Sequence, residues 1–189
     1  ISTKHGNKLP VHRVAWPDWW SDGFGSTSRE TAAARRTQAD FTANQALLSM
    51  ASILGSHIPE TAVLKIKKIH EALLFWDEHT MGAAESISRP FSENSMVQWA
   101  EKSSYAWEAY KENKLLLETA MGLIQDYIPR TDKPCIAVFN TLNWQRSGLI
   151  EVYIDHEILP PGIAFRILDS NGKETAAQPS RSRPDGTYW

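Results

Sequence analysis

A long run of helix-type periodicity in the middle of the chain constrains the fold most. Ser92 is suited to cap a helix that continues to about Tyr127, because apolar side chains recur along one side of this stretch. Such a helix has about 35 residues and is about 50 Å long at 1.5 Å per residue. Its apolar side is formed by Met96, Trp99, Ala106, Tyr110, Leu117, Ala120, Leu123 and Ile124.

An earlier segment predicts a second helix of similar character. Thr27 and Glu30 have the spacing of a capping box, which marks the first turn of a helix. The helix is expected over 28–54, with Gly55 as its C-cap residue. Its apolar face is expected to hold Phe41, Leu48 and Ala51, with Asn44 between them and with Leu47 and Leu54 at its edges.

Between these two lies a third predicted helix, which starts near Pro59 and ends after Trp76. Its apolar stripe runs through Val63, Ile66, either Ile69 or His70, Leu73 and Trp76. Three long helices with short connections predict an antiparallel three-helix bundle over residues 27–130. Residues 1–26 are rich in tryptophan, glycine and proline, and we expect an irregular segment there.

The sequence changes character after Pro129, where β-type patterns replace the helical ones. Candidate strands lie at 136–140, 148–154 and 163–168, and further ones at 175–179 and 187–189. The predicted fold class is therefore mainly α, a three-helix bundle followed by a truncated antiparallel β segment over 131–189. So few strands make a poor sheet on their own, and we interpret the chain as an internal piece of a larger protein.

Composition excludes several classes of protein. The formal net charge is −2 and the basic residues are not gathered in one long run, which argues against nucleic acid or an anionic membrane as partner. No apolar run approaches the ~20 residues that span a bilayer. The single cysteine, Cys135, excludes an internal disulfide framework and a multi-cysteine zinc site, but it leaves the cellular compartment open.

The strongest candidate for chemistry is Asp77-Glu78-His79, where the second helical pattern breaks before Gly82. Carboxylates and a neutral imidazole are suitable zinc ligands, and they also perform general acid–base catalysis. The alternative is a plain polar helix end, at which a histidine complements the helix dipole. We expect no complete catalytic site here, because one cluster does not supply the usual three zinc ligands.

The second candidate is the segment around Trp19, Trp20 and Asp22. Aromatic rings stack on the C–H faces of sugars, and a neighbouring carboxylate accepts hydrogen bonds from sugar hydroxyls, so the segment suits carbohydrate binding. The alternative, which we favour from the residues alone, is that these tryptophans cover the end of the helical bundle. No phosphate-binding loop, dinucleotide fingerprint or nucleophile elbow is present.

The order of these motifs resembles glycoside hydrolase family 38, the α-mannosidases. A Trp-Trp-Ser-x-Gly-Phe segment over 19–24 leads into a capped helix, and the acidic/His motif follows the second helix. The most specific match is Phe-Asn-x-Leu-x-Trp-x-Arg-x-Gly over 139–148, and residues 185–189 resemble a strand of the family's β domain. The resemblance implies that 1–26 lead in from the catalytic domain, 27–130 are the helical middle domain, and 131–189 begin a C-terminal β-sandwich.

The resemblance implies a retaining hydrolase with a zinc ion and an α-mannoside or related glycan as substrate. The family's nucleophile and acid/base belong to a preceding catalytic domain, so this chain is expected to hold no catalytic residue and to be inactive alone. The family's zinc-binding histidine corresponds to Asp77 if Gly82 sets the register, or to His79 if the imidazole does, and we favour His79. Glu78, Trp19, Trp20 and Asp22 are then the expected substrate-binding residues. A non-catalytic helical module that binds carbohydrate or assembles with a partner chain is the alternative.

Overall fold

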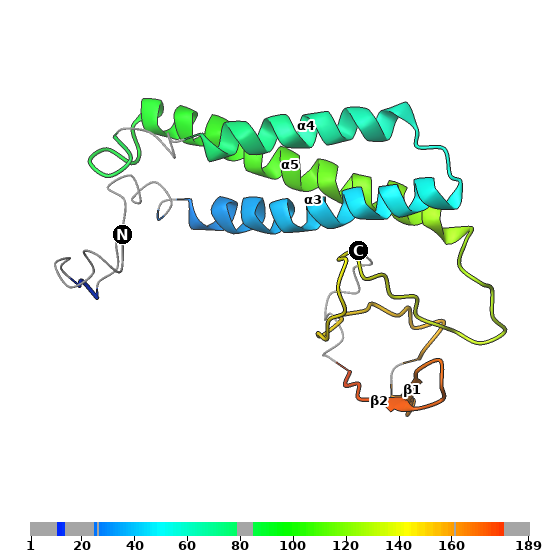
Figure 1. The fold of residues 1–189 in the computed structure, drawn as a ribbon. Coiled ribbons are helices and arrows are strands. Elements are labelled where there is room, and N and C mark those ends of the chain that lie inside the picture. The colour runs from blue at the N-terminus through cyan, green and yellow to red at the C-terminus, as the bar shows by residue number, and fades with distance from the viewer. Residues whose placement is uncertain (1–10, 14–24, 26, 79–84, 161, 180–189) are drawn as a thin grey trace. The chain divides into compact units, whose positions relative to one another are not determined.

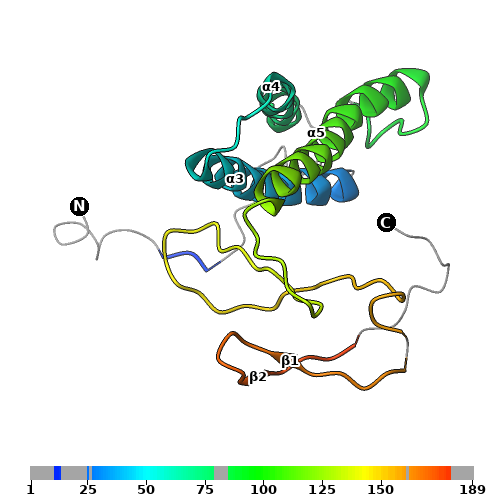
Figure 2. The ribbon, with the colours of Figure 1, turned by 90° about the vertical axis from the view of Figure 1, so that its right-hand side faces the viewer.

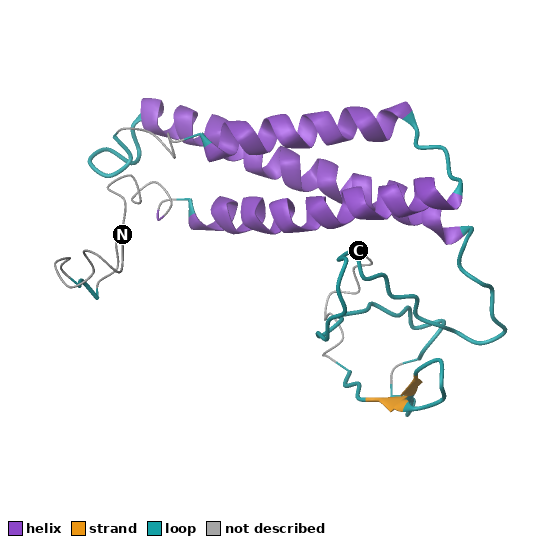
Figure 3. Cartoon of the chain, in the orientation of Figure 1, coloured by secondary structure: helices purple, strands orange, loops and turns teal. Residues whose placement is uncertain are grey.

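The computed structural model describes residues 11–13, 25, 27–78, 85–160 and 162–179 (Figure 1). Three long helices are followed by a short two-stranded sheet, as Figure 3 shows by colour. The helices are α3 (Ser28–Leu54), α4 (Glu60–Asp77) and α5 (Glu93–Gln125), and the strands are β1 (Ile167–Leu168) and β2 (Glu174–Thr175). The predicted fold class, mainly α with three packed helices and a small antiparallel sheet, is confirmed.

The chain divides into two compact units. Residues 1–131 together with 135–145 form the helical unit, and residues 132–134 together with 146–189 form the second unit. The helical unit contains the candidate zinc ligands.

The end of α3 follows the sequence prediction, but its start does so only in part. Gly55 has a left-handed φ of 111°, and its N–H donates to the carbonyls of Ala51 and Ser52, which closes the helix. Thr27 is the N-cap residue, yet its side chain makes no capping hydrogen bond. Glu30 instead accepts a hydrogen bond from Nε1 of Trp107 on α5, at 3.3 Å. The capping box therefore predicts where the helix starts but not how its side chains bond.

The other two helices also begin at the predicted residues. Pro59 is the N-cap residue of α4, in an extended conformation. Ser92 caps α5, because its Oγ accepts a hydrogen bond from the N–H of Ser95 at 3.3 Å. The cap residues predicted from the sequence therefore mark the starts of α4 and α5.

Helix α5 is the central element of the bundle. Both α3 and α4 pack against it, whereas α3 and α4 contact each other little, and Figure 2 shows the three helices more nearly end-on. The α3–α5 contact pairs Glu30 with Trp107 and Asn44 with Asn113, so these two helices run parallel. Helix α4 runs antiparallel to α5, because Lys65 lies opposite Glu112 and Phe75 lies opposite Lys102.

The core contains large side chains from α4 and mostly small ones from α5. Trp76 is 1% exposed and is the largest fully buried side chain among the residues that the structure describes. The alanines of α5 that face inward allow the neighbouring helices to approach closely. The buried apolar set is Ala34, Phe41, Leu47, Leu48, Ala51, Ala62, Ile69, Ala72, Leu73, Trp76, Ala106, Ala109, Leu116, Ala120 and Ile124.

A buried amide pair joins α3 to α5 within this core. Nδ2 of Asn44 donates to Oδ1 of Asn113 at 2.8 Å and to the Asn113 carbonyl at 3.0 Å. Both side chains are at most 3% exposed, so shifting either helix along its axis would leave buried polar groups without partners. The pair therefore favours one alignment of α3 on α5.

Several residues of the predicted apolar stripes lie outside the core. Leu54, Val63, Met96 and Trp99 are exposed by 40–55%, although all four belong to the apolar faces predicted from the sequence. The sequence leaves open whether Ile69 or His70 belongs to the apolar stripe of α4. In the structure Ile69 is buried, whereas His70 is exposed and its ring packs edge-on against Phe41. Periodicity locates the apolar side of a helix, but it does not reveal which turns have a neighbour.

The second unit contains fewer strands than predicted. The hairpin pairs Ile167 with Thr175 and Leu168 with Glu174, and Oδ1 of Asp169 accepts the N–H groups of Asn171 and Lys173 in its turn. The candidate strand 163–168 keeps only its last two residues.

Within the described residues, neither 136–140 nor 148–154 is a strand, so both of these predictions are wrong. An alternating segment forms a strand only when a neighbouring strand supplies its hydrogen bonds. Leu149 and Tyr153 are largely exposed in the structure. The candidate strand 187–189 lies outside the described residues.

Candidate functional site

The acidic/His segment begins where α4 ends. Trp76 holds the last turn in the core, Asp77 is the last helical residue, and Glu78 leaves the helix with φ −55° and ψ 139°. The N–H of Glu78 still donates to the carbonyl of Leu74 at 3.0 Å. The break predicted from the sequence is therefore a defined helix end, and His79 follows it just outside the described residues.

Asp77 is attached to α3. Its Oδ2 atom accepts a hydrogen bond from Nε2 of Gln38 at 2.6 Å. Because 39 residues separate the two side chains, this bond fixes the last turn of α4 to a distant part of the chain.

Glu78 is attached to α5 through Lys102. The ammonium Nζ lies 3.2 Å from Oε2 of Glu78 and 3.0 Å from its backbone carbonyl oxygen. The same Nζ donates to the carbonyl of Phe75 at 2.5 Å. Helix α4 has no basic residue in its own last turn, so this cation on α5 meets the negative end of its dipole.

The described residues do not build a metal site by themselves. They contain no group of three or more His, Cys, Asp or Glu side chains that could hold a metal ion. Asp77 and Glu78 are consecutive, but α3 engages one carboxylate and α5 the other. Carboxylates are suitable zinc ligands, but in the described part of the chain these two are too few for the usual site with three protein ligands.

The remaining predicted site residues lie outside the described residues. These are His79, Trp19, Trp20 and Asp22, and their proposed roles stay predictions. Of the site residues named from the sequence, the structure places Asp77 and Glu78.

Gln38 and Lys102 were not singled out from the sequence. Each sits among ordinary polar residues of a helix, and its contact at the α4 end spans 39 or 24 residues. The alignment of α4 with α5 would have identified Lys102. Lys65 lies opposite Glu112, so ten residues further along α4 and ten residues back along α5 bring Phe75 opposite Lys102.

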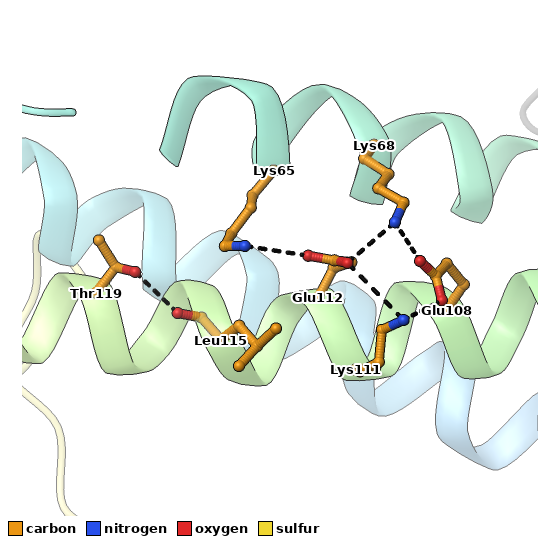
Figure 4. A network of polar contacts seen from close by, with 7 residues as sticks. All are labelled: Lys65, Lys68, Glu108, Lys111, Glu112, Leu115 and Thr119. Carbon is orange, nitrogen blue, oxygen red and sulfur yellow. Dashed lines mark hydrogen bonds and ion pairs between the residues drawn. The ribbon is translucent and has the colours of Figure 1, made fainter. Parts of the chain in front are cut away.

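A second polar cluster links α4 to α5 nearer the middle of the bundle (Figure 4). Glu112 is its centre, with a side chain only 10% exposed, and it pairs with Lys65 at 3.4 Å and Lys68 at 3.0 Å. Glu108 pairs with Lys68 and, at 2.6 Å, with Lys111. Both glutamates are engaged by lysines, so we assign this cluster to holding α4 on α5 rather than to chemistry.

The pKa values of this cluster agree with that assignment. Hydrogen bonds from Lys111 and Lys68 lower the pKa of Glu108. Burial by itself raises the pKa of Glu112, but the hydrogen bonds and charges of Lys68 and Lys65 outweigh it and lower the pKa overall. Hydrogen bonds to Glu108 and Glu112 raise the pKa of Lys68. All three groups are therefore charged at neutral pH, and the cluster is ionic.

An open groove runs along the exposed side of α4. It has a volume of about 610 Å³, and its apolar lining includes Leu74 and Phe75, which are 70% and 50% exposed. Phe75 stacks on Tyr105 of α5 with ring centroids 5.2 Å apart. The residues that line it are Ile66, Lys67, His70, Glu71, Leu74, Phe75 and Glu78.

The chain was compared with models of protein families, with curated proteins and with solved structures, and none of these matches it. None of the described helices has both the length and the apolar character needed to cross a membrane. The family resemblance therefore rests on the motifs of the sequence, and function is argued below from those motifs and the end of α4.

Proposed function

We propose that this chain is the helical part of a zinc-dependent, retaining glycoside hydrolase that resembles the family 38 α-mannosidases. In this proposal the end of α4 presents one metal ligand to a site completed by a catalytic domain that precedes the chain. The bound zinc would hold hydroxyl groups of the sugar. The chain would supply neither the nucleophile nor the acid/base, and would therefore be inactive alone.

The observation that carries this proposal is the anchoring of the α4 end. A metal ligand needs a fixed backbone, because outer contacts orient the side chains that bind the metal. Trp76 in the core, Gln38 on α3 and Lys102 on α5 hold three consecutive residues, Trp76 to Glu78. The acidic/His motif therefore starts from a rigid point rather than from a freely moving loop.

The same contacts favour His79 over Asp77 as the metal ligand. Asp77 already accepts a hydrogen bond of 2.6 Å from Gln38, and Glu78 is paired with Lys102. A zinc ion would compete with those donors for the carboxylate oxygens. An imidazole at the next position in the sequence would add a nitrogen ligand for the metal. It would leave the contacts of Gln38 with Asp77 and of Lys102 with Glu78 in place.

Metal removal tests the proposal on the polypeptide that joins this chain to its catalytic domain. We expect about one bound zinc per chain by elemental analysis, and hydrolysis of an aryl α-mannoside that a chelator abolishes and added zinc restores. The same treatment should leave the helical content unchanged by circular dichroism. An enzyme that hydrolyses α-mannosides equally well with and without the chelator would contradict the zinc requirement, and one that hydrolyses none would contradict the substrate class.

A second candidate function is assembly, and the groove on α4 favours it. Exposed apolar side chains along one helix face mark an interaction surface in many proteins. The groove is bordered by one lysine and two glutamates, Lys67, Glu71 and Glu78. A rim with both signs of charge suits a second copy of the same chain, which would bring its own lysine and glutamates.

Leu74→Glu tests this alternative, because it places a charge in the apolar part of the groove without touching the core. If the chain self-associates through α4, light scattering should show a dimer for the wild type and a monomer for L74E. Thr61→Glu, at an exposed position of the same helix outside the groove lining, is the matched control and should remain dimeric. A wild type that is monomeric at all concentrations would rule out this mode of assembly.

A further inference from the structure

The outer face of α4 has the residue spacing of a helix that packs against another helix. Leu64, Lys67, Glu71 and Leu74 follow one another at steps of three, four and three residues, and we call these four residues the seam. Residues at such steps lie on one side of a helix, and they form the contact line of a coiled coil. All four are exposed, the two leucines by 55% and 70%.

The opposite side of α4 faces the core of the bundle. Two residues along a helix turn a side chain by about 200°, so Ile69 points away from both Lys67 and Glu71. Ile69 is fully buried, as expected for the side that packs in the bundle. The buried residues of α4 are Ala62, Ile69, Ala72, Leu73 and Trp76, and none of them belongs to the seam. A partner can therefore contact the seam while α4 stays packed on α5.

The seam has the same pattern of apolar residues in both directions, with one basic and one acidic residue at its centre. A second copy that runs antiparallel, related by a two-fold axis between Lys67 and Glu71, would place Leu64 opposite Leu74 and Lys67 opposite Glu71. Each of these contacts would occur twice, as in any two-fold interface. A parallel copy would instead place lysine opposite lysine and glutamate opposite glutamate, which is unfavourable. Charge complementarity thus favours the antiparallel pair.

The groove on α4 provides space for this partner. Its lining of about 610 Å³ includes the seam residues Lys67, Glu71 and Leu74. In the antiparallel pair, Leu64 of the second copy would enter the groove beside Leu74. Glu78 lies beyond the apolar part of the seam, and its carboxylate is already paired with Lys102 at 3.2 Å.

We propose that two copies of this chain pair antiparallel through the seam of α4, around a two-fold axis between Lys67 and Glu71. The pairing rests on the second candidate function, assembly through α4, and adds the direction and alignment of the two copies. Lys65 and Lys68 are engaged by glutamates of α5. Neither Lys67 nor Glu71 forms an ion pair with another of the described residues, so both charges can pair with the second copy.

A charge exchange within the seam tests the alignment in the 189-residue chain. Lys67→Glu or Glu71→Lys alone would place like charges opposite each other at two sites, and we expect a dimer dissociation constant at least about tenfold higher. The double variant K67E/E71K restores both attractions and should return to within about threefold of the wild type. Glu118→Lys, at an exposed position of α5, makes the same charge change outside the seam and should leave the constant unchanged. Analytical ultracentrifugation measures the constants, and circular dichroism checks that each variant keeps its helical content.

Cross-linking tests the direction of the two helices independently. The variants Leu64→Cys and Leu74→Cys are made in a Cys135→Ser background, because Cys135 is an exposed free thiol. In the antiparallel pair each introduced thiol lies about 15 Å along the axis from its own copy, at 1.5 Å per residue over ten residues. A short bismaleimide should therefore link L64C to L74C in a mixture of the two variants, and should link neither variant to itself.

The possible outcomes separate this pairing from the functions on which it rests. A dimer in which L64C links to itself, or in which K67E/E71K is no tighter than the single variants, would overturn the antiparallel alignment and leave assembly through α4 in place. A wild type that is monomeric at all concentrations would overturn both the alignment and assembly. Neither result affects the proposed hydrolase, which zinc content and glycoside hydrolysis test separately.

Discussion

His79→Ala is expected to remove zinc and glycoside hydrolysis together from the polypeptide that joins this chain to its catalytic domain. Losing an outer contact of a metal site costs about 10- to 100-fold in affinity or activity, so losing a ligand should cost more than about 100-fold in kcat/KM. The expected loss is large because a zinc site with three protein ligands keeps only two after the substitution. Zinc content and hydrolysis of an aryl α-mannoside are the two measurements.

Two further variants make this result specific. His57→Ala is the matched control, because His57 is exposed in the connection at the opposite end of α4 and should have no effect on zinc. Asp77→Asn tests the other register, since an asparagine oxygen can still accept the hydrogen bond from Gln38 but brings no negative charge to a metal. If D77N loses zinc and H79A retains it, Asp77 is the ligand, and if both retain zinc and activity, the acidic/His segment does not bind the metal.

Trp76→Ala should destabilise the bundle more than any other single truncation in its core. Trp76 is 1% exposed and has the largest fully buried side chain in the described part of the chain, and replacing such a residue with alanine costs about 3–5 kcal/mol. Typical domains have only about 5–15 kcal/mol of unfolding free energy, so the loss should be visible as a large shift of the denaturation midpoint. Urea denaturation followed by far-ultraviolet circular dichroism measures it.

Trp99→Ala provides the comparison for this experiment. Trp99 lies on α5 and belongs to the predicted apolar stripe, but it is 40% exposed. Its loss should cost less than about 1 kcal/mol, as for most partly exposed positions without special contacts. Equal losses for the two tryptophans would contradict the role of Trp76 as the main core residue of α4.

The helix boundaries were predictable because they depend on local chemistry. Gly55 adopts the left-handed conformation that glycine tolerates, Pro59 precedes a first turn, and Ser92 caps the next helix. Each of these signals acts within a few residues of the boundary that it sets. A single sequence therefore contains enough information to place them.

Contacts between helices were less predictable, since they depend on the alignment of distant segments. The stripe of α5 included Met96 and Trp99 although the described residues leave both exposed. Lys102 and Gln38 were missed for the same reason, because their partners lie 24 to 39 residues away and no local pattern marks them. The candidate strand 148–154 failed in a related way, since its alternation is local but the pairing that would make it a strand is not.

The central place of α5 determines how this chain can be divided. Because α3 and α4 contact each other little, a piece that ends after α4 would contain two helices whose apolar sides have lost their shared partner. Trp76 and Ile69 would then face water, although every residue of α3 and α4 is still present. A shortened version that retains this core therefore has to extend from the start of α3 at Ser28 to the end of α5 at Gln125.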